Sequence, residues 1–481
     1  MQTIELAKAL HALDVYDLSP LFETNMPGYM LDPIFGVIQK AKNVEQQYYN
    51  TQIIVFGEHN GSHVDAPVYK LPGTKSIDKY PAAYLIAPYK KLDLRAFHPE
   101  AGKSITAAQL EETLIRDNLK IEEGDIVLLE YGWDRHYLPD TQVLFRKDWW
   151  AANVPGLSED AMRFLAEKKI KAVGSDTVTP DAAYTDSDWS YLPGREQYFL
   201  PNDILMIGGL IGMAEAPNRG LFMTAPLKIK DGSGSPIRPL LLDDRGSPEL
   251  YDALKALTAY DISPTFENNM PGFFNHPTLG VVSDARDYEK YGFYSQTLIM
   301  CEHNGSHTDS YSHIHNHLDS MEKIPSNHFI GPYKKYDLTA FDTPAGQNAT
   351  LAQILEVERR DGITAEEDDI VLLQFGWDKW YDPESRDIEK LKKYSFGPGI
   401  DEDTVRYFSE KKIRSIGADV VSADMAFPFM PGHLEYFLPK GILIMESFVN
   451  MSDAPAQGIF AAFPWKIKDG SGCPMSPILF G

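Results

Sequence analysis

An internal duplication limits what this chain can fold into more than any other feature of its sequence. Glu-His-Asn-Gly-Ser-His-x-Asp occurs at 58–65 and again at 302–309, and Lys-Ile-Lys-Asp-Gly-Ser-Gly occurs at 228–234 and at 466–472. Other shared segments keep the same order, and the spacing between the copies stays between 238 and 244 residues. Such a period is too long for a solenoid repeat. The chain therefore contains two copies of one domain.

A polar segment marks the boundary between the copies. The chain has 481 residues, which is more than a single hydrophobic core usually organises. Residues 242–248 read Leu-Asp-Asp-Arg-Gly-Ser-Pro, a composition typical of a linker. We therefore predict an N-terminal domain at 1–242 and a C-terminal domain at 248–481.

Charge and cysteine content narrow the class of protein. The formal net charge of -24 disfavours nucleic acid and anionic membranes as partners, because phosphate binding requires clusters of Lys and Arg. Two cysteines do not make a disulfide framework. No apolar stretch reaches the roughly 18–20 residues of a membrane span, and the N-terminus lacks the features of a signal peptide. We expect a cytoplasmic protein.

Each copy carries the patterns of both strands and helices. Short apolar runs predict buried strands, at 126–129, 170–173 and 204–207 in the first copy and at 370–373, 413–416 and 442–445 in the second. Residues that favour N-cap positions precede amphipathic runs and predict helices; these residues are Thr106, Ser158, Thr350 and Asp401. The pattern indicates a mixed α and β domain and leaves its topology open.

Four side chains that commonly bind metals lie within eleven residues of the second copy, namely His303, His307, Asp309 and His313. Imidazole and carboxylate ligands suit zinc, manganese or iron. Asn-Gly-Ser at 304–306 is poor helix material, so a strand that leads into a tight turn is expected here. The alternative is a polar loop with scattered histidines. We expect His315 and His317 to be solvated loop residues or hydrogen-bond donors to the ligands, not ligands themselves.

A second pair of residues supports a metal site. Glu446 ends the apolar run at 442–445, where a carboxylate is costly unless it is paired or bound to metal. His433 lies thirteen residues earlier. The first copy keeps His59, His63 and Asp65, but three of its six equivalent positions differ. At those three positions Tyr69, Arg195 and Gly208 replace His313, His433 and Glu446.

The pattern His-x-x-x-His-x-Asp-x-x-x-His, with the later His and Glu, resembles the cyclase-like metal-dependent hydrolases of the bacterial kynurenine formamidase and isatin hydrolase type. The resemblance covers each half nearly end to end. It implies an α+β fold, a swivelling β/β/α domain in tandem duplication that forms an intramolecular pseudo-dimer. It also leaves open whether the tandem chain forms a homo-oligomer.

Applied to the matching positions of this sequence, the resemblance implies that His303, His307 and Asp309 bind metal. Asp309 would bridge if two ions are present. His433 and Glu446 would complete a second position. His313 would bind metal or act as the catalytic base. The expected cofactor is a divalent metal, Zn or Mn, as one or two ions in the C-terminal half; no organic cofactor is expected.

The first copy departs from this pattern. A phenol at Tyr69 cannot accept a proton near neutral pH, since its pKa is about 10. Arg195 would place a fixed positive charge where a ligand should be. His59, His63 and Asp65 could still form a residual metal site. We expect a degenerate half that packs on the active one, as a neighbouring subunit does across a two-fold interface.

The predicted function is hydrolysis of a C–N bond (amide, formamide or lactam) or of a lactone in a small molecule, through a metal-bound hydroxide. The alternatives are a metal-dependent lyase or cyclase on the same site, and a non-catalytic metal-stabilised binding protein. Five aromatic residues could shape an apolar pocket for an aromatic substrate, with core packing as the alternative for each; they are Phe273, Phe274, Trp377, Trp380 and Tyr381.

Overall fold

Two sheets with the same strand order form the framework of the protein. The computed structural model describes residues 2–28, 35–138, 149–274, 276, 279–385, 387–426 and 428–481. The first sheet has the order β1-β13-β11-β5-β7-β9-β10-β4-β12, and the second has the order β14-β26-β24-β18-β20-β22-β23-β17-β25. The predicted tandem duplication of an α+β domain is confirmed.

The strands of the two sheets correspond one to one. The first sheet contains β1 (Val15–Asp17), β4 (His63–Asp65), β5 (Ile86–Asp93), β7 (Ile126–Glu130), β9 (Ala172–Ser175), β10 (Leu205–Gly208), β11 (Arg219–Met223), β12 (Gly234–Pro236) and β13 (Leu240–Leu242). The second contains β14 (Ala259–Asp261), β17 (His307–Asp309), β18 (Ile330–Asp337), β20 (Ile370–Gln374), β22 (Ser415–Ala418), β23 (Leu443–Glu446), β24 (Gln457–Ala461), β25 (Gly472–Pro474) and β26 (Ile478–Phe480).

The centre of each sheet is parallel. Strands β5, β7, β9 and β10 run parallel in the first sheet, as do β18, β20, β22 and β23 in the second. Parallel strands are buried on both faces and therefore read as continuous apolar runs. The strand predicted at 126–129 is fully buried. The runs predicted at 170–173 and 413–416 are confirmed as strands that begin two residues later.

Helices cover these sheets where N-caps predicted them. The principal helices of the two halves are α3 (Ala107–Arg116), α6 (Glu159–Glu167), α9 (Leu351–Asp361) and α11 (Glu402–Glu410). Thr106 and Thr350 form capping boxes at two of them. Shorter elements are α2 (Val44–Gln47), α5 (Trp149–Ala152), α8 (Tyr288–Tyr291), α10 (Ile388–Ser395) and the strand pairs β6–β8 (Ser104–Ile105, Gly156–Leu157) and β19–β21 (Asn348–Ala349, Gly399–Ile400). None of the described helices is long and apolar enough to cross a membrane.

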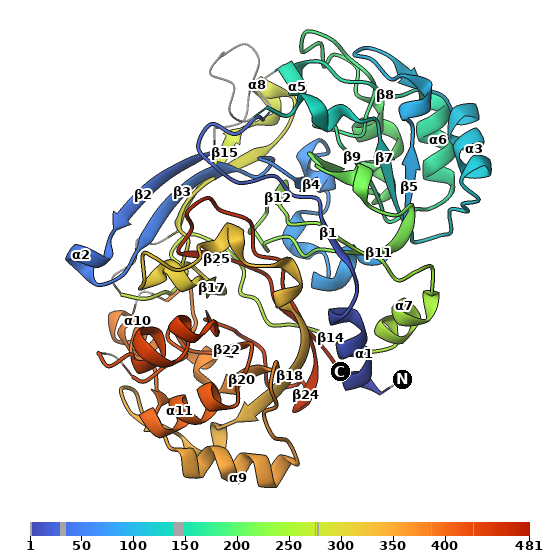
Figure 1. The fold of residues 1–481 in the computed structure, drawn as a ribbon. Helices are drawn as coiled ribbons and strands as arrows, with labels where there is room; N and C mark the ends of the chain where they lie inside the picture. The colour runs from blue at the N-terminus through green and yellow to red at the C-terminus, as the bar shows by residue number, and fades with distance from the viewer. Residues whose placement is uncertain are drawn as a thin grey trace.

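A third sheet joins the two halves. Hairpin β2–β3 (Gly36–Lys42, Thr51–Gly57) of the first half and hairpin β15–β16 (Gly280–Arg286, Ser295–Cys301) of the second form one four-stranded antiparallel sheet. We call these hairpins the arms. Val55 lies opposite Ile299, its own counterpart in the other copy, so a local two-fold axis passes between them. Figure 1 shows the blue arm alongside the yellow one.

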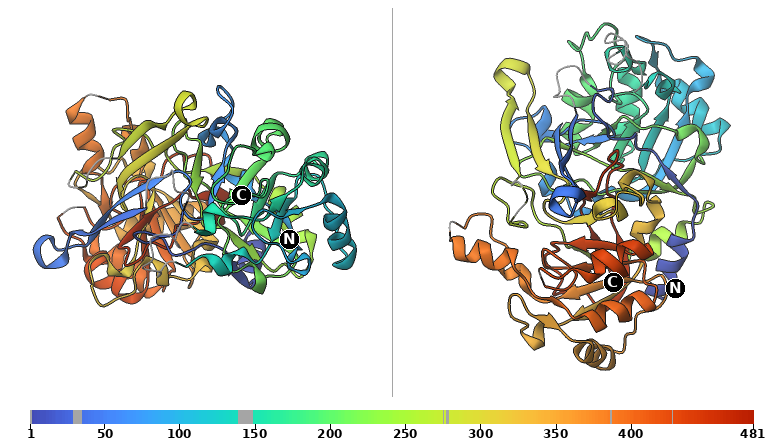
Figure 2. Two further views of the ribbon diagram at one scale, coloured as in Figure 1. Left: turned by 90° about the horizontal axis from the view of Figure 1, so that it is seen from above. Right: turned by 60° about the vertical axis from the view of Figure 1, so that its left-hand side comes forward.

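A helix of the first half packs on the second half, and the two halves share a hydrophobic cluster. Helix α1 (Thr3–His11) buries Leu6 and Leu10 in a cluster that includes Ile459 and Phe480 of the second half. Helix α7 (Pro248–Lys255) contributes to the same cluster. The right-hand view of Figure 2 shows α1 and both termini beside the second half. The predicted intramolecular pseudo-dimer is therefore confirmed.

Candidate metal centre

The histidine motif of the second copy occupies a strand, a tight turn and a second strand. Strand β16 ends at Cys301, the turn carries His303, and β17 begins at His307. Gly305 in the turn has a left-handed backbone conformation, with a φ of +64°. An added Cβ there would collide with Phe266. The expected strand and tight turn are thus present, and glycine is required at this bend.

Strand pairing places the distant ligand candidates beside the motif. Across the antiparallel pair β17–β23, His307 lies directly opposite Glu446, where side chains of paired residues are neighbours. His433 enters from the π-helix η14 (Gly432–Tyr436), and His313 ends the short helix η9 (Tyr311–His313). All six predicted residues of the second half are buried and line one cavity.

The distances within the cluster suit a shared cation. His307 Nε2 lies 3.5 Å from Asp309 Oδ1 and 3.4 Å from Glu446 Oε2. His433 Nε2 lies 3.4 Å from Asp309 Oδ2 and 3.7 Å from Glu446 Oε1. Two donor atoms that each lie about 2.1 Å from one tetrahedral ion are about 3.4 Å apart. The separations are therefore those of ligands around an ion, and a divalent metal fits this donor set.

Two groups of candidate ligands overlap at one carboxylate. His303, Asp309 and His313 form one group, and His307, Asp309 and Glu446 form the other; within each, the ligand atoms lie within 4.8 Å of one another. Asp309 belongs to both groups, as expected of a bridging carboxylate. In the first half the corresponding group is His59, His63 and Asp65.

Hydrogen bonds from the outer ring nitrogens orient the imidazoles. The carbonyl oxygens of Gly305 and Asn50 each lie 2.9 Å from a ring Nδ1, of His307 and His313 respectively. A carbonyl only accepts, so Nδ1 carries the proton and Nε2 presents its lone pair to the cluster. His433 Nδ1 is held in the same way by Asp424 Oδ2, at 2.7 Å.

Burial and neighbouring charges set the protonation of the cluster. Burial lowers the pKa of His313 to about 3, with the nearby His303 and His433 adding to the effect against Asp309. Burial alone would lower the pKa of His303, but Asp309 and Glu302 outweigh it and raise that pKa to about 10. The carboxylates therefore favour a positive charge at His303. A metal ion that binds there would displace the proton from the imidazole ring.

The arm of the first half completes this site. The Asn50 N–H donates to the His313 carbonyl at 2.7 Å, in addition to the contact of its own carbonyl with His313 Nδ1. The Gln52 N–H donates to Glu302 Oε1 at 3.1 Å, and Glu302 also accepts from the N–H of Ser471. The Tyr49 ring lies 5.7 Å from that of His313. Glu302 therefore joins the arm of the first half to the second half.

A largely apolar cavity of about 440 Å³ opens above the cluster. Phe273, Phe274 and Leu434 line it from the second half, and Tyr48 and Tyr49 line it from the arm of the first. Of the five aromatic residues considered for such a pocket, the other three pack with the core of the second half. Trp377 lies within that core, and Trp380 and Tyr381 are partly buried and pack against it. For those three the core alternative is correct.

The sequence reasoning missed several residues at this site. Asp424 and Asn50 were not singled out, although both orient histidines. His276 also lines the cavity, and its buried Nδ1 has no hydrogen-bond partner within the described part of the chain. The His315 ring forms a hydrogen bond with the His433 carbonyl, and His317 is exposed. Cys301 and Cys473 are buried and unbonded to each other.

The equivalent site of the first half is rearranged around Arg195. Its Nη2 and Nε lie 2.8 and 3.2 Å from Asp65 Oδ2. His59 Nδ1 contacts the other oxygen of Asp65 at 2.8 Å. Strand pairing places Gly208 opposite His63, but a Cβ at Gly208 would collide with the His63 ring and the Val178 carbonyl. A glutamate equivalent to Glu446 therefore has no room here.

Comparisons with known proteins agree with the duplication. The family model described as "Putative cyclase" matches residues 16–182 and again residues 260–425. An isatin hydrolase from Roseibium aggregatum is 27% identical over 249 residues, which are 48% of this chain and 92% of that protein. A kynurenine formamidase from Salinibacter ruber is 24% identical over 206 residues, 42% of this chain and 84% of that protein.

Solved structures match half of the chain at a time. A crystal structure of an isatin hydrolase bound to the product analogue thioisatinate has a TM-score of 0.44 and 24% identity, and it covers 50% of this chain and 99% of its own. A structure described as a potential metal-dependent hydrolase with cyclase activity has a TM-score of 0.37 and 25% identity over 48% of this chain and 98% of its own. With the family model matched twice, the chain belongs to the putative cyclase family and carries two copies of its domain in tandem.

Proposed function

We propose that the second half is a divalent-metal-dependent hydrolase of a small molecule, acting on an amide, formamide, lactam or lactone. The observation that carries the proposal is the buried cluster of four histidines and two carboxylates at the floor of an apolar cavity. The names of the two relatives, a hydrolase of isatin and a formamidase, support the same class of bond. Zinc or manganese suits the nitrogen and oxygen donors.

The ligands would be His303, His307, Asp309, His433 and Glu446, with Asp309 shared if two ions bind. A divalent ion held there lowers the pKa of water from about 15.7 towards 7 and polarises a carbonyl group. The apolar walls of the cavity exclude bulk water and favour a flat substrate. Tyr49, from the other half, covers the site beside His313.

His313 is the proposed proton carrier. Its Nδ1 is bonded to the Asn50 carbonyl, so its Nε2 is free to accept a proton from the attacking water. The water oxygen then adds to the carbonyl carbon, the C–N or C–O bond breaks, and His313 returns the proton to the leaving nitrogen or oxygen. Because burial keeps the pKa of His313 low, the imidazole is neutral at neutral pH.

His307→Ala tests whether the cluster binds the metal and drives the reaction. We expect the variant to lose tightly bound metal and to lose turnover of a panel of amides, lactams and lactones by a factor of about 10³ or more. His317→Ala, which removes an exposed histidine of the same segment, should retain both. Metal analysis and steady-state kinetics on the same preparations provide the readout. Turnover by metal-free His307→Ala protein would contradict the proposal.

Reaction in ¹⁸O-labelled water separates hydrolysis from a lyase or cyclase on the same site. Hydrolysis places one labelled oxygen in the carboxyl product, whereas elimination or cyclisation leaves the product unlabelled. Metal content with no turnover of any substrate in the panel would favour the third alternative, a metal-stabilised binding protein.

A further inference from the structure

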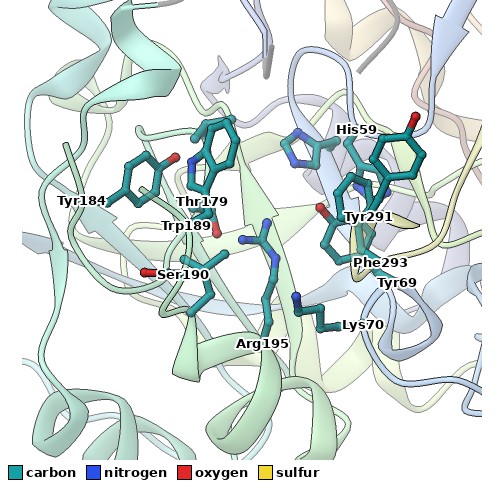
Figure 3. Close-up of a pocket in the computed structure, with 13 residues that line it drawn as sticks. His59, Tyr69, Lys70, Thr179, Tyr184, Trp189, Ser190, Arg195, Tyr291 and Phe293 are labelled. Carbon is teal, nitrogen blue, oxygen red and sulfur yellow. The ribbon is translucent and has the colours of Figure 1, made fainter. Parts of the chain in front are cut away.

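The first half retains a cavity at the position equivalent to the cavity above the metal centre. Its volume is about 270 Å³, close to the lower end of the roughly 300–1,000 Å³ typical of small-molecule pockets. Arg195 lies at its floor, and the arm of the second half contributes Tyr291 and Phe293. Figure 3 shows the guanidinium in the middle of this cavity, between two groups of aromatic rings.

Three exchanges between the halves make this cavity more positive than its counterpart. Arg195 stands where the second half has His433, and Gly208 stands where it has Glu446. Lys70 replaces Ile314, which lines the other cavity. Each exchange adds a positive charge or removes a negative one. A pocket that had only lost its metal would not need two new cations.

Unused hydrogen-bond donors face this cavity. Arg195 is only 7% exposed. Its Nε and Nη2 bond Asp65, whereas Nη1 donates to no residue in the described part of the chain. Thr179 is 3% exposed and lines the cavity, yet its Oγ1 has no partner among the described residues. The backbone of Arg195 is fixed by Asp181, because the Arg195 backbone N–H donates to Asp181 Oδ2 at 2.9 Å.

Lys70 and several aromatic rings form the rest of the cavity lining. Lys70 Nζ lies 3.1 Å from Glu196 at the exposed rim, so its charge is held at the cavity mouth. Tyr69 packs against Phe293 with ring centroids 5.2 Å apart, and Tyr184 and Trp189 stand on the opposite side (Figure 3). Flat rings on two sides leave a slot for a planar group.

We infer that this cavity binds a small aromatic carboxylate. Arg195 and Lys70 would hold the carboxylate, since a guanidinium forms short charge-assisted hydrogen bonds with it, and the Thr179 hydroxyl would donate a further bond. The aromatic walls would enclose the ring. A metal ion is disfavoured at the same place by the guanidinium charge. The inference concerns binding alone and holds whether or not the second half turns over a substrate.

Calorimetric titration of the metal-loaded full chain with benzoate tests the inference. Benzoate should bind in the millimolar range or tighter, and benzamide, which has the same shape without the charge, should bind at least about ten-fold more weakly. Lys70→Ile, which introduces the residue of the second half, and Thr179→Val, which keeps the side-chain shape, should each weaken benzoate binding by a similar factor. Lys120→Ile removes a cation that is 80% exposed and should leave the benzoate Kd unchanged.

Three results would overturn the inference. They are the absence of benzoate binding, equal affinity for benzamide, and unchanged benzoate affinity in both folded cavity variants. Thermal melts of the variants establish that they are folded. Turnover is not a readout in this experiment, so its outcome is separate from the fate of the proposed hydrolase activity.

Discussion

Asp424 determines which nitrogen of His433 faces the candidate ligands. It accepts from the backbone N–H groups of Gly432 and His433 and contacts the His433 ring at Nδ1. Carboxylate partners of this kind fix the ring orientation and increase the basicity of the metal-facing nitrogen. The first copy uses the equivalent Asp181 to hold the backbone of Arg195. One scaffold carboxylate therefore positions a ligand in one half and a cation in the other.

Asp424→Asn tests this role. We expect metal affinity to fall by about 10–100-fold, with turnover restored at saturating metal, because the amide holds His433 less firmly without removing it. Titration with a chromophoric chelator measures the affinity. Asp181→Asn changes the matched position in the first half and should leave metal affinity unaltered. An unchanged metal Kd in Asp424→Asn would show that His433 needs no such support.

Comparison of the two copies identified three site residues of the second half but did not identify Asp424. His313, His433 and Glu446 stood out because the first half lacks them. Asp424 did not, since aspartate is present in both copies and serves both halves. His276 lies 27 residues before His303 in sequence, and only the folded chain brings its ring to 5.5 Å from that of His303.

At the scale of elements, both the sheet and the arm of the first half contribute to the site. The central strands could be predicted because burial on both faces makes them continuous apolar runs. The helices could be predicted because capping residues precede them. The arms were not, because their pairing partner lies about 244 residues away in the other copy. Strand β3 supplies Gln52 to Glu302, and the segment just before it supplies Tyr49 and Asn50 to His313.

Tyr49→Ala tests the contribution of the arm to substrate binding. Loss of the ring opens the cavity beside His313 and removes apolar contact area, so we expect KM to rise by about ten-fold with a smaller effect on kcat. Ile38→Ala, on the exposed face of the same arm, is the matched control and should behave as wild type. A reduced kcat with unchanged KM in Tyr49→Ala would assign the arm to the chemical step instead of to binding.

At the scale of the whole molecule, the duplication converts a two-fold interface into an intramolecular one. The repeated segments predicted the duplication, and the family resemblance implied the pseudo-dimer. The exchange of α1 onto the second half could not be predicted, since an amphipathic helix does not reveal which of two equivalent sheets it covers. The division at 242–248 remains a prediction, and the shared core argues that neither half is complete without the other.

Expression of residues 248–481 alone tests that dependence. The isolated half lacks Asn50, the β3 partner of β16 and the α1 cover, so we expect low solubility or a loss of turnover of about 10²-fold or more. Co-expression with residues 1–242 should restore activity, and that pair serves as the control. A stable 248–481 protein with full turnover would contradict a supporting role for the first half.

The central claim is that one half carries the metal and the other has exchanged it for Arg195. Anomalous scattering from a crystal of the metal-loaded chain, collected at the metal edge, tests it most directly. The account predicts one or two peaks among His303, His307, Asp309, His433 and Glu446, and no peak beside Arg195. A peak among His59, His63 and Asp65, or no peak in the second half, would contradict it.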